Sequence, residues 1–115
     1  MEVKGRDTVA NLPRHTTITS EEIRKALKDP VQSIIDAIKM TLERTPPELS
    51  GDLVETGIVL AGGGSLLRGI DKVISEETGL HVRIAEDPLT AVARGTLVIL
   101  ENFDQARRHL ETGDD

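Results

Sequence analysis

The sequence predicts an α/β fold organised around one βαβ unit with parallel strands, flanked by helices and preceded by a pair of strands. An apolar run, Ile58-Val59-Leu60-Ala61, ends at three consecutive glycines. A helical pattern follows, with Leu67, Ile70, Val73 and Ile74 on one face, and Gly79 is placed to end it. Residues 81–85 then read as a second strand. Strand, helix and strand in this order favour parallel pairing with a right-handed crossover.

The triple glycine, Gly62-Gly63-Gly64, is the strongest candidate for a ligand site. Glycine permits positive φ angles and lets a ligand come close to the backbone. A turn between strand and helix also presents free N–H groups, which favours a phosphate. The same pattern is compatible with a tight turn that binds nothing. Its predicted position at the carboxyl end of a parallel strand favours the ligand site.

The N-terminal residues predict a strand pair and then two helices. Residues 1–9 and 15–19 are the expected strands, with His15 an exposed strand residue rather than a metal ligand. Thr19 and Glu22 form a capping box that begins a short helix ending near Lys28. Asp29-Pro30 is expected to begin a longer helix. Its predicted buried stripe is Val31, Ile34, Ile35, Ile38 and Leu42.

Two further proline signals divide the rest of the chain. Pro46-Pro47 ends the long helix and opens one more helical turn. Asp87-Pro88 is expected to begin the last helix. The apolar stripe of that helix is Leu89, Val92, Ala93, Leu97, Leu100 and Phe103. Beyond Asp104 we expect a fraying helix end and a solvated acidic tail.

Composition narrows the functional classes. The 115 residues carry a net charge of −6, scattered basic residues and one aromatic residue, which argues against nucleic-acid binding. Without cysteine there is no disulfide framework and no cysteine-ligated metal. The N-terminus lacks a signal-peptide pattern and no apolar run reaches membrane-span length, so the sequence predicts a cytosolic protein.

The glycine-rich stretch Leu60-Ala61-Gly62-Gly63-Gly64-Ser65-Leu66-Leu67-Arg68-Gly69-Ile70-Asp71 matches neither GxGxxG nor the Lys-containing phosphate loop. It resembles the adenosine motif of the actin-like ATPase superfamily, which has a ribonuclease H-like fold. Within that superfamily, several segments resemble the C-terminal part of the MreB family of bacterial cell-shape proteins: residues 2–7, 19–23, 45–49, 76–79 and 85–90. The tail after Asp104 has no match.

The resemblance implies roles for individual residues. Gly62, Gly63 and Gly64 would border the α-phosphate and ribose of ATP or ADP, and Ser65, Leu66 and Leu67 would form the wall beside the adenine. Arg68 and Asp71 are expected on a helix face instead. The implied divisions are a lid-subdomain remnant at 1–28, part of the second-half nucleotide-binding core at 29–87, a closing helix at 88–104 and a polar acidic tail at 105–115.

The resemblance also implies filaments of MreB-like subunits at the membrane, acting with the cell-wall synthesis machinery to determine rod shape. Hydrolysis needs Mg²⁺ and two phosphate-binding hairpins, and these are expected outside this sequence. No catalytic residue or metal ligand is therefore assigned here. The carboxylate pairs Glu76-Glu77, Glu86-Asp87 and Asp114-Asp115 are interpreted as structural or solvated. A sheet of two strands has open edges. We therefore expect either a fragment that is stable only partly or as an oligomer, or a piece that docks on another chain through an exposed aliphatic surface.

Two alternatives remain open from the sequence. One is an interaction module that docks on full-length MreB-like subunits without using nucleotide. The other is a small stand-alone nucleotide-binding enzyme that shares only the βαβ unit, which would require ATP turnover sensitive to Gly63→Val.

Overall fold

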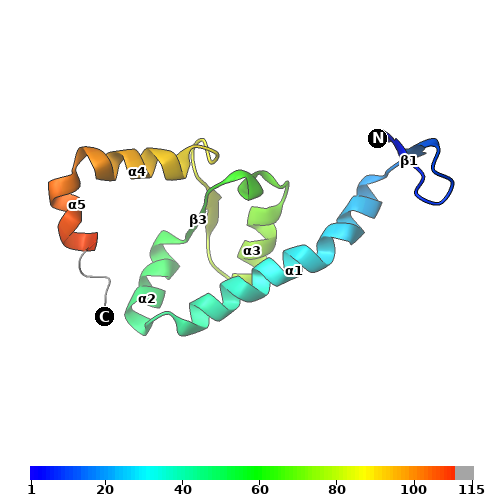
Figure 1. Ribbon diagram of the computed structural model, residues 1–115. Helices are drawn as coiled ribbons and strands as arrows, with labels where there is room; N and C mark the ends of the chain where they lie inside the picture. The colour runs from blue at the N-terminus through cyan, green and yellow to red at the C-terminus, as the bar shows by residue number, and fades with distance from the viewer. Residues whose placement is uncertain (111–115) are drawn as a thin grey trace. The chain divides into compact units, whose positions relative to one another are not determined.

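An antiparallel hairpin opens the chain in the computed structural model, which describes residues 1–110 (Figure 1). Strand β1 (Glu2–Arg6) pairs with β2 (Pro13–Thr17), with Glu2 opposite Thr17 and Arg6 opposite Pro13. The predicted strand pair is confirmed. The chain divides into two units, Met1–Met40 and the described part of Thr41–Asp115.

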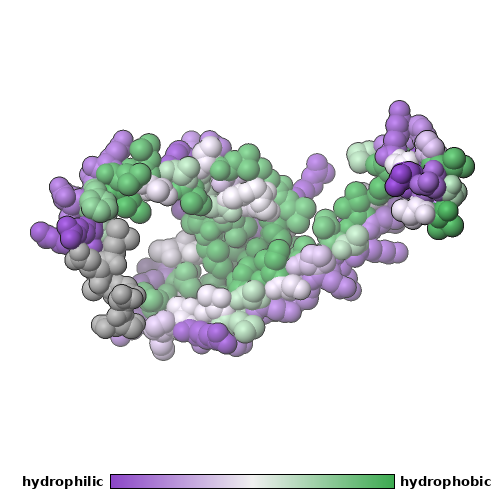
Figure 2. Space-filling view, in the orientation of Figure 1, coloured by the Kyte–Doolittle hydropathy of each residue, from purple (hydrophilic) through white to green (hydrophobic). Residues whose placement is uncertain are grey.

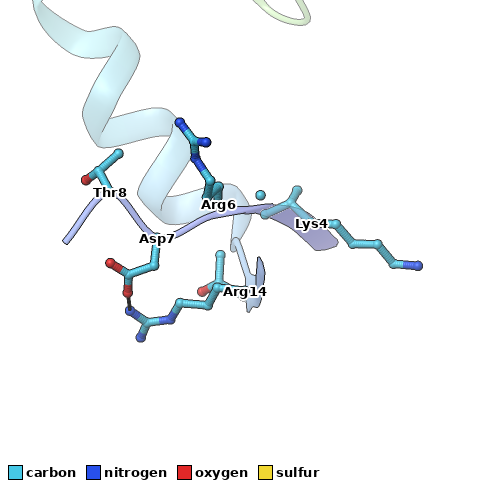
Figure 3. Close-up of a pocket in the computed structure, with 8 residues that line it drawn as sticks. Lys4, Arg6, Asp7, Thr8 and Arg14 are labelled. Carbon is cyan, nitrogen blue, oxygen red and sulfur yellow. Dashed lines mark hydrogen bonds and ion pairs between the residues drawn. The ribbon is translucent and has the colours of Figure 1, made fainter. Parts of the chain in front are cut away.

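The loop of the hairpin is held by one carboxylate, that of Asp7. Its Oδ1 accepts hydrogen bonds from the backbone N–H groups of Val9 and Ala10 at 2.9 and 3.1 Å. Its Oδ2 accepts from Nη1 of Arg14 at 3.1 Å, across the hairpin (Figure 3). The two backbone N–H groups, and then the guanidinium, lower the pKa of Asp7 below its ordinary value of 3.8.

Helix α1 (Ser20–Arg44) follows the hairpin, and its N-terminal cap is the predicted one. The Thr19 N–H donates to Glu22 Oε2 at 2.8 Å, and the Glu22 N–H donates to Thr19 Oγ1 at 3.2 Å. The predicted break at Asp29-Pro30 is wrong, because α1 runs through Pro30 without interruption. A proline removes only one backbone hydrogen bond, that to the carbonyl four residues earlier, and the turns on either side can maintain the helix.

The buried stripe predicted for this helix is only partly found. Ile35 is 2% exposed, whereas Ile34 is 48% exposed. The other three members of the stripe, Val31, Ile38 and Leu42, are half-buried. The helical period therefore identified the more buried side of α1 but overestimated how deeply it is covered.

Within the second unit, the helix boundary predicted at Pro46-Pro47 is found. Helix α2 (Pro47–Thr56) has proline at its first position and ten residues, so it is longer than the single turn expected. Gly57 follows it with φ 73° and donates its N–H to the Leu53 carbonyl at 2.8 Å. A Cβ on Gly57 would lie 2.3 Å from the His81 carbonyl oxygen. Only glycine fits this approach between the two chain segments.

The predicted βαβ unit with parallel strands is confirmed. Strands β3 (Ile58–Leu60) and β4 (Val82–Ile84) pair in parallel and are connected through α3 (Ile70–Thr78). Ile70 and Ile74 of α3 and Val82 of β4 are buried and form the apolar core of this unit. Gly79 has left-handed geometry and donates its N–H to the Ser75 carbonyl at 2.9 Å, so it ends α3 as predicted.

The C-terminal helical region differs from the prediction. Asp87 has φ 44° and lies in a turn, where its carboxylate accepts a hydrogen bond from Thr90 Oγ1 at 2.6 Å. Helix α4 (Ala91–Glu101) therefore begins after the turn and not at Asp87-Pro88. It is separated from α5 (Phe103–Leu110) at Asn102, whose side chain and backbone N–H both donate to the Val98 carbonyl. A single closing helix is therefore wrong.

The predicted stripe of this region is exposed rather than buried within the unit. Figure 2 shows hydrophobic side chains gathered over α4. The exposed residues include Leu89, Val92, Leu97, Leu100 and Phe103. Among residues 1–110, no helix combines the length and apolar character needed to cross a membrane. The expected acidic tip, residues 111–115, lies outside the described residues.

Gly57→Ala should destabilise the second unit by about 1–3 kcal/mol, because the new Cβ collides with the His81 carbonyl at a positive φ. Gly51→Ala is the matched control. Gly51 lies within α2 with open space around it, so alanine should stabilise by about 0.5–1 kcal/mol. Urea unfolding followed by circular dichroism measures both changes. Equal stability of the two variants would contradict the close approach.

The Asp7 carboxyl should titrate below its ordinary pKa of 3.8 in the folded hairpin. Because the folded-state pKa is lowered, the stabilising contribution is complete above the unfolded-state value and is lost as the pH falls through the folded-state value. Carboxyl-carbon NMR titration measures the midpoint. Arg14→Gln should reduce the shift without abolishing it, since both backbone donors remain. An unshifted midpoint in the parent chain would refute this.

Candidate functional site

The triple glycine forms a loop at the carboxyl end of β3, as predicted. Gly62 has φ 83°, and a 3₁₀ turn, Gly63–Leu66, follows it. Ser65 closes the loop, because its N–H and its Oγ both donate to the Gly62 carbonyl, at 3.2 and 2.6 Å. Helix α3 begins only at Ile70. The expectation that the helix follows the glycine turn directly and includes Leu67 is therefore wrong, and the dipole of α3 does not begin at this loop.

A second loop, the one that follows β4, holds the glycine loop in place. The Ala85 N–H donates to the Leu60 carbonyl at 2.8 Å, and the Gly62 N–H donates to the Pro88 carbonyl at 2.8 Å. A Cβ on Gly63 would lie 3.3 Å from Leu89 Cδ2. The sequence alone did not indicate Pro88 and Leu89 as residues of the site. Parallel pairing was the available signal, because it brings the loops after both strands to one edge.

Two backbone donors of the glycine loop remain available. Neither the Gly63 nor the Gly64 N–H has a hydrogen-bond acceptor among residues 1–110. A Cβ on Gly64 would meet nothing within 4 Å. The loop thus presents two N–H groups without acceptors, with free space beside Gly64, which is an arrangement that an anionic oxygen can approach.

Comparisons with known proteins identify the family. The model of the family described as MreB/Mbl protein matches residues 1–108. The cell shape-determining protein Mbl of Bacillus cereus is 51% identical over 105 residues, and the cell shape-determining protein MreB of Escherichia coli is 49% identical over 104. These alignments cover 91% and 90% of this chain. The chain belongs to the MreB/Mbl family.

Solved structures of the same family confirm the expected partial actin-like fold. The crystal structure of MreB5 of Spiroplasma citri bound to ADP matches 98% of this chain with a TM-score of 0.84 and 40% identity. The structure bound to AMPPNP matches 95% with a TM-score of 0.85 and 39% identity. The chain spans about a third of the length of these proteins and of the curated MreB and Mbl relatives.

The three residues predicted to flank adenine in an MreB-family pocket differ in accessibility. Ser65 is 5% exposed and its hydroxyl is bonded to Gly62, so its side chain supports the loop from inside. Leu66 and Leu67 are 56% and 39% exposed. The sequence predicts Leu67 and Val73 on the buried face of the following helix, but Leu67 precedes α3 and Val73 is 37% exposed.

The remaining polar candidates do not converge on the glycine loop. Glu76 and Glu77 are exposed on α3, and Asp71 lies in its first turn. The carbonyls of Glu86 and Asp87 accept hydrogen bonds from the Arg94 guanidinium, which fixes the loop after β4. Asp114-Asp115 lies outside the described residues. Within residues 1–110, no group of three or more His, Asp and Glu side chains is arranged to hold a metal ion.

The glycines of the loop should respond differently to alanine. Gly62→Ala should destabilise by about 1–2 kcal/mol because φ 83° is strained for a residue with a Cβ. Gly64→Ala should change stability by less than about 0.5 kcal/mol because its surroundings are open. Chemical unfolding of both variants tests this difference. A large loss from Gly64→Ala would show that the space beside it is not free.

Proposed function

We propose that this chain supplies the adenosine side of an ATP pocket in an MreB-like cytoskeletal ATPase. The open glycine loop, with two unbonded N–H groups at the carboxyl edge of a parallel pair, is the observation that carries the proposal. Support comes from the two MreB5 neighbours, which were solved with ADP and with AMPPNP and match nearly the whole chain.

Each part of the loop has a distinct role in this proposal. Gly62, Gly63 and Gly64 border the α-phosphate and ribose, where free N–H groups and missing Cβ atoms suit an anionic ligand. Leu66 and Leu67 offer exposed apolar surface to the adenine, and buried Ser65 positions the loop. Mg²⁺ and the outer phosphates are held by segments outside this sequence, and hydrolysis depends on those segments.

The family function extends the proposal beyond the pocket. The whole protein forms filaments of MreB-like subunits in the cytoplasm, associates with the membrane and guides the wall-synthesis machinery that gives rod shape. In that protein, residues 1–28 are part of the lid subdomain and residues 29–87 part of the nucleotide-binding core. Residues 88–104 supply the closing segment, now divided between the turn, α4 and the start of α5. Residues 105–115 are its polar, acidic end.

Adding ADP to the isotope-labelled chain should shift the amide NMR signals of residues 62–67. AMP should act nearly as well as ADP, because the chain contacts only the nucleoside and α-phosphate. Gly64→Val should weaken binding at least about tenfold, or 1.4 kcal/mol, by filling the approach to the loop without strain. Gly51→Ala, in α2, is the control and should bind normally. Equal binding by the parent chain and Gly64→Val would refute the proposed pocket.

The exposed apolar side chains on α4 favour the alternative of an interaction module. Val92 and Leu100 are 71% and 63% exposed, and such surface is usually covered by a partner. A module of this kind would bind full-length MreB-like subunits without nucleotide. Calorimetry measures the binding of this chain to full-length MreB-like subunits. Binding that neither Gly64→Val nor ADP changes would support the module, whereas binding that depends on both would support the pocket.

A further inference from the structure

The cationic side chains of the N-terminal hairpin fall into two groups. Arg14 is paired with Asp7 at 3.1 Å and is therefore already neutralised. Lys4 and Arg6 of β1 are exposed, and neither forms an ion pair with any residue in the described part of the chain. In Figure 3, Arg6 is directed away from the Asp7–Arg14 pair, and Lys4 extends from the same strand. The free positive charge of the hairpin thus comes from β1.

These two cations share one face of the strand. Residues two apart in a strand point to the same side, about 7 Å apart along the strand. Glu2 lies on this face as well, but its carboxylate is 3.2 Å from the His15 ring nitrogen of β2. The hairpin sequence has three basic and two acidic side chains and so a net charge of +1. The rest of the chain therefore carries −7 of the total net charge of −6. A cationic face on an acidic protein is suited to an acidic partner surface.

Helix α2 carries such a surface. Glu48, Asp52 and Glu55 are all exposed and spaced so that they lie on one side of the helix, and α2 contains no basic residue. None of the three carboxylates forms an ion pair among residues 1–110. One helical turn separates Glu48 and Asp52 by about 6 Å along the axis, close to the spacing of Lys4 and Arg6 on β1. The two charged rows are therefore matched in sign and in spacing.

We propose that the β1 cations, Lys4 and Arg6, dock on the acidic side of α2 of a second copy of this chain. Because the two surfaces differ, after one contact forms one copy keeps an unused α2 surface and the other keeps an unused β1 surface. Such a heterologous contact adds subunits head to tail until a ring closes or a filament grows. The proposal deepens the proposed homopolymer by naming two surfaces and the charges that pair them, and it does not depend on the glycine loop.

Charge reversal on either surface tests the contact. Sedimentation velocity should show that the parent chain associates as its concentration rises. Association should weaken at least about tenfold between 0.05 and 0.5 M NaCl, because exposed ion pairs are screened. Lys4→Glu with Arg6→Glu should abolish association, as should Glu48→Lys with Asp52→Lys. The controls make equal charge changes elsewhere: Lys25→Glu with Lys28→Glu, and Glu76→Lys with Glu101→Lys.

Combining the reversals makes the test specific. One chain carrying both reversed surfaces should associate again, and so should a mixture of the two singly reversed chains. Circular dichroism establishes that every variant is folded. A parent chain that stays monomeric at millimolar concentration and low salt would overturn the proposal, as would reversals that are not rescued in combination. Binding of the parent chain to anionic phosphatidylglycerol vesicles without self-association would instead assign the cations to lipid and also overturn it.

Nucleotide binding is measured on the same samples. Normal ADP-induced shifts in residues 62–67 of a charge-reversed chain that no longer associates would separate the two functions. A Gly64→Val chain that loses ADP binding but associates normally would also separate nucleotide binding from self-association. A failed pocket and a failed contact therefore give different results.

Discussion

The parallel pairing of β3 and β4 is the constraint on which the second unit depends. Each strand has only three residues, and backbone bonds outside the strands extend the pairing at both ends. The Ile58 N–H donates to the His81 carbonyl, and the Ala85 N–H donates to the Leu60 carbonyl, both at 2.8 Å. The first bond brings the chain so close to Gly57 that no Cβ fits there. The second delivers the loop after β4 to the glycine loop.

The same short pairing explains why so much apolar surface remains uncovered. Two parallel strands expose both faces and both edges, and in α/β proteins helices or further strands cover them. Here the buried Ile70 and Ile74 of α3 cover part of the sheet, while Val59 of β3 remains 46% exposed. The apolar side chains of α4 are similarly exposed. At about 25 cal/mol per Å² of apolar area, covering them would add substantially to stability. The chain spans about a third of the length of the MreB and Mbl relatives.

Local signals in the sequence predicted the features that local chemistry determines. The Thr19–Glu22 capping box, the helix boundary at Pro46-Pro47 and the terminating Gly79 need only neighbouring residues, and all three are confirmed. Local signals failed at Pro30 and Asn102. The one hydrogen bond lost at Pro30 does not end α1, whereas the side-chain bond of Asn102 accompanies a break between α4 and α5. The glycine loop was predicted, but Pro88 and Leu89 beside it depend on a contact between two loops, which no local pattern reveals.

The two candidate functional surfaces use different physical means. The glycine loop presents backbone N–H groups whose positions are fixed by hydrogen bonds to Pro88 and Ser65, so its properties depend on conformation and not on side-chain charge. The β1 and α2 surfaces present exposed charges, which attract over longer distances but contribute little once screened by salt. A pocket of the first kind holds a ligand in a defined geometry. Charged surfaces of the second kind suit contacts between subunits that must form and release. The glycine loop and the charged surfaces occupy different segments of the chain and use different chemistry.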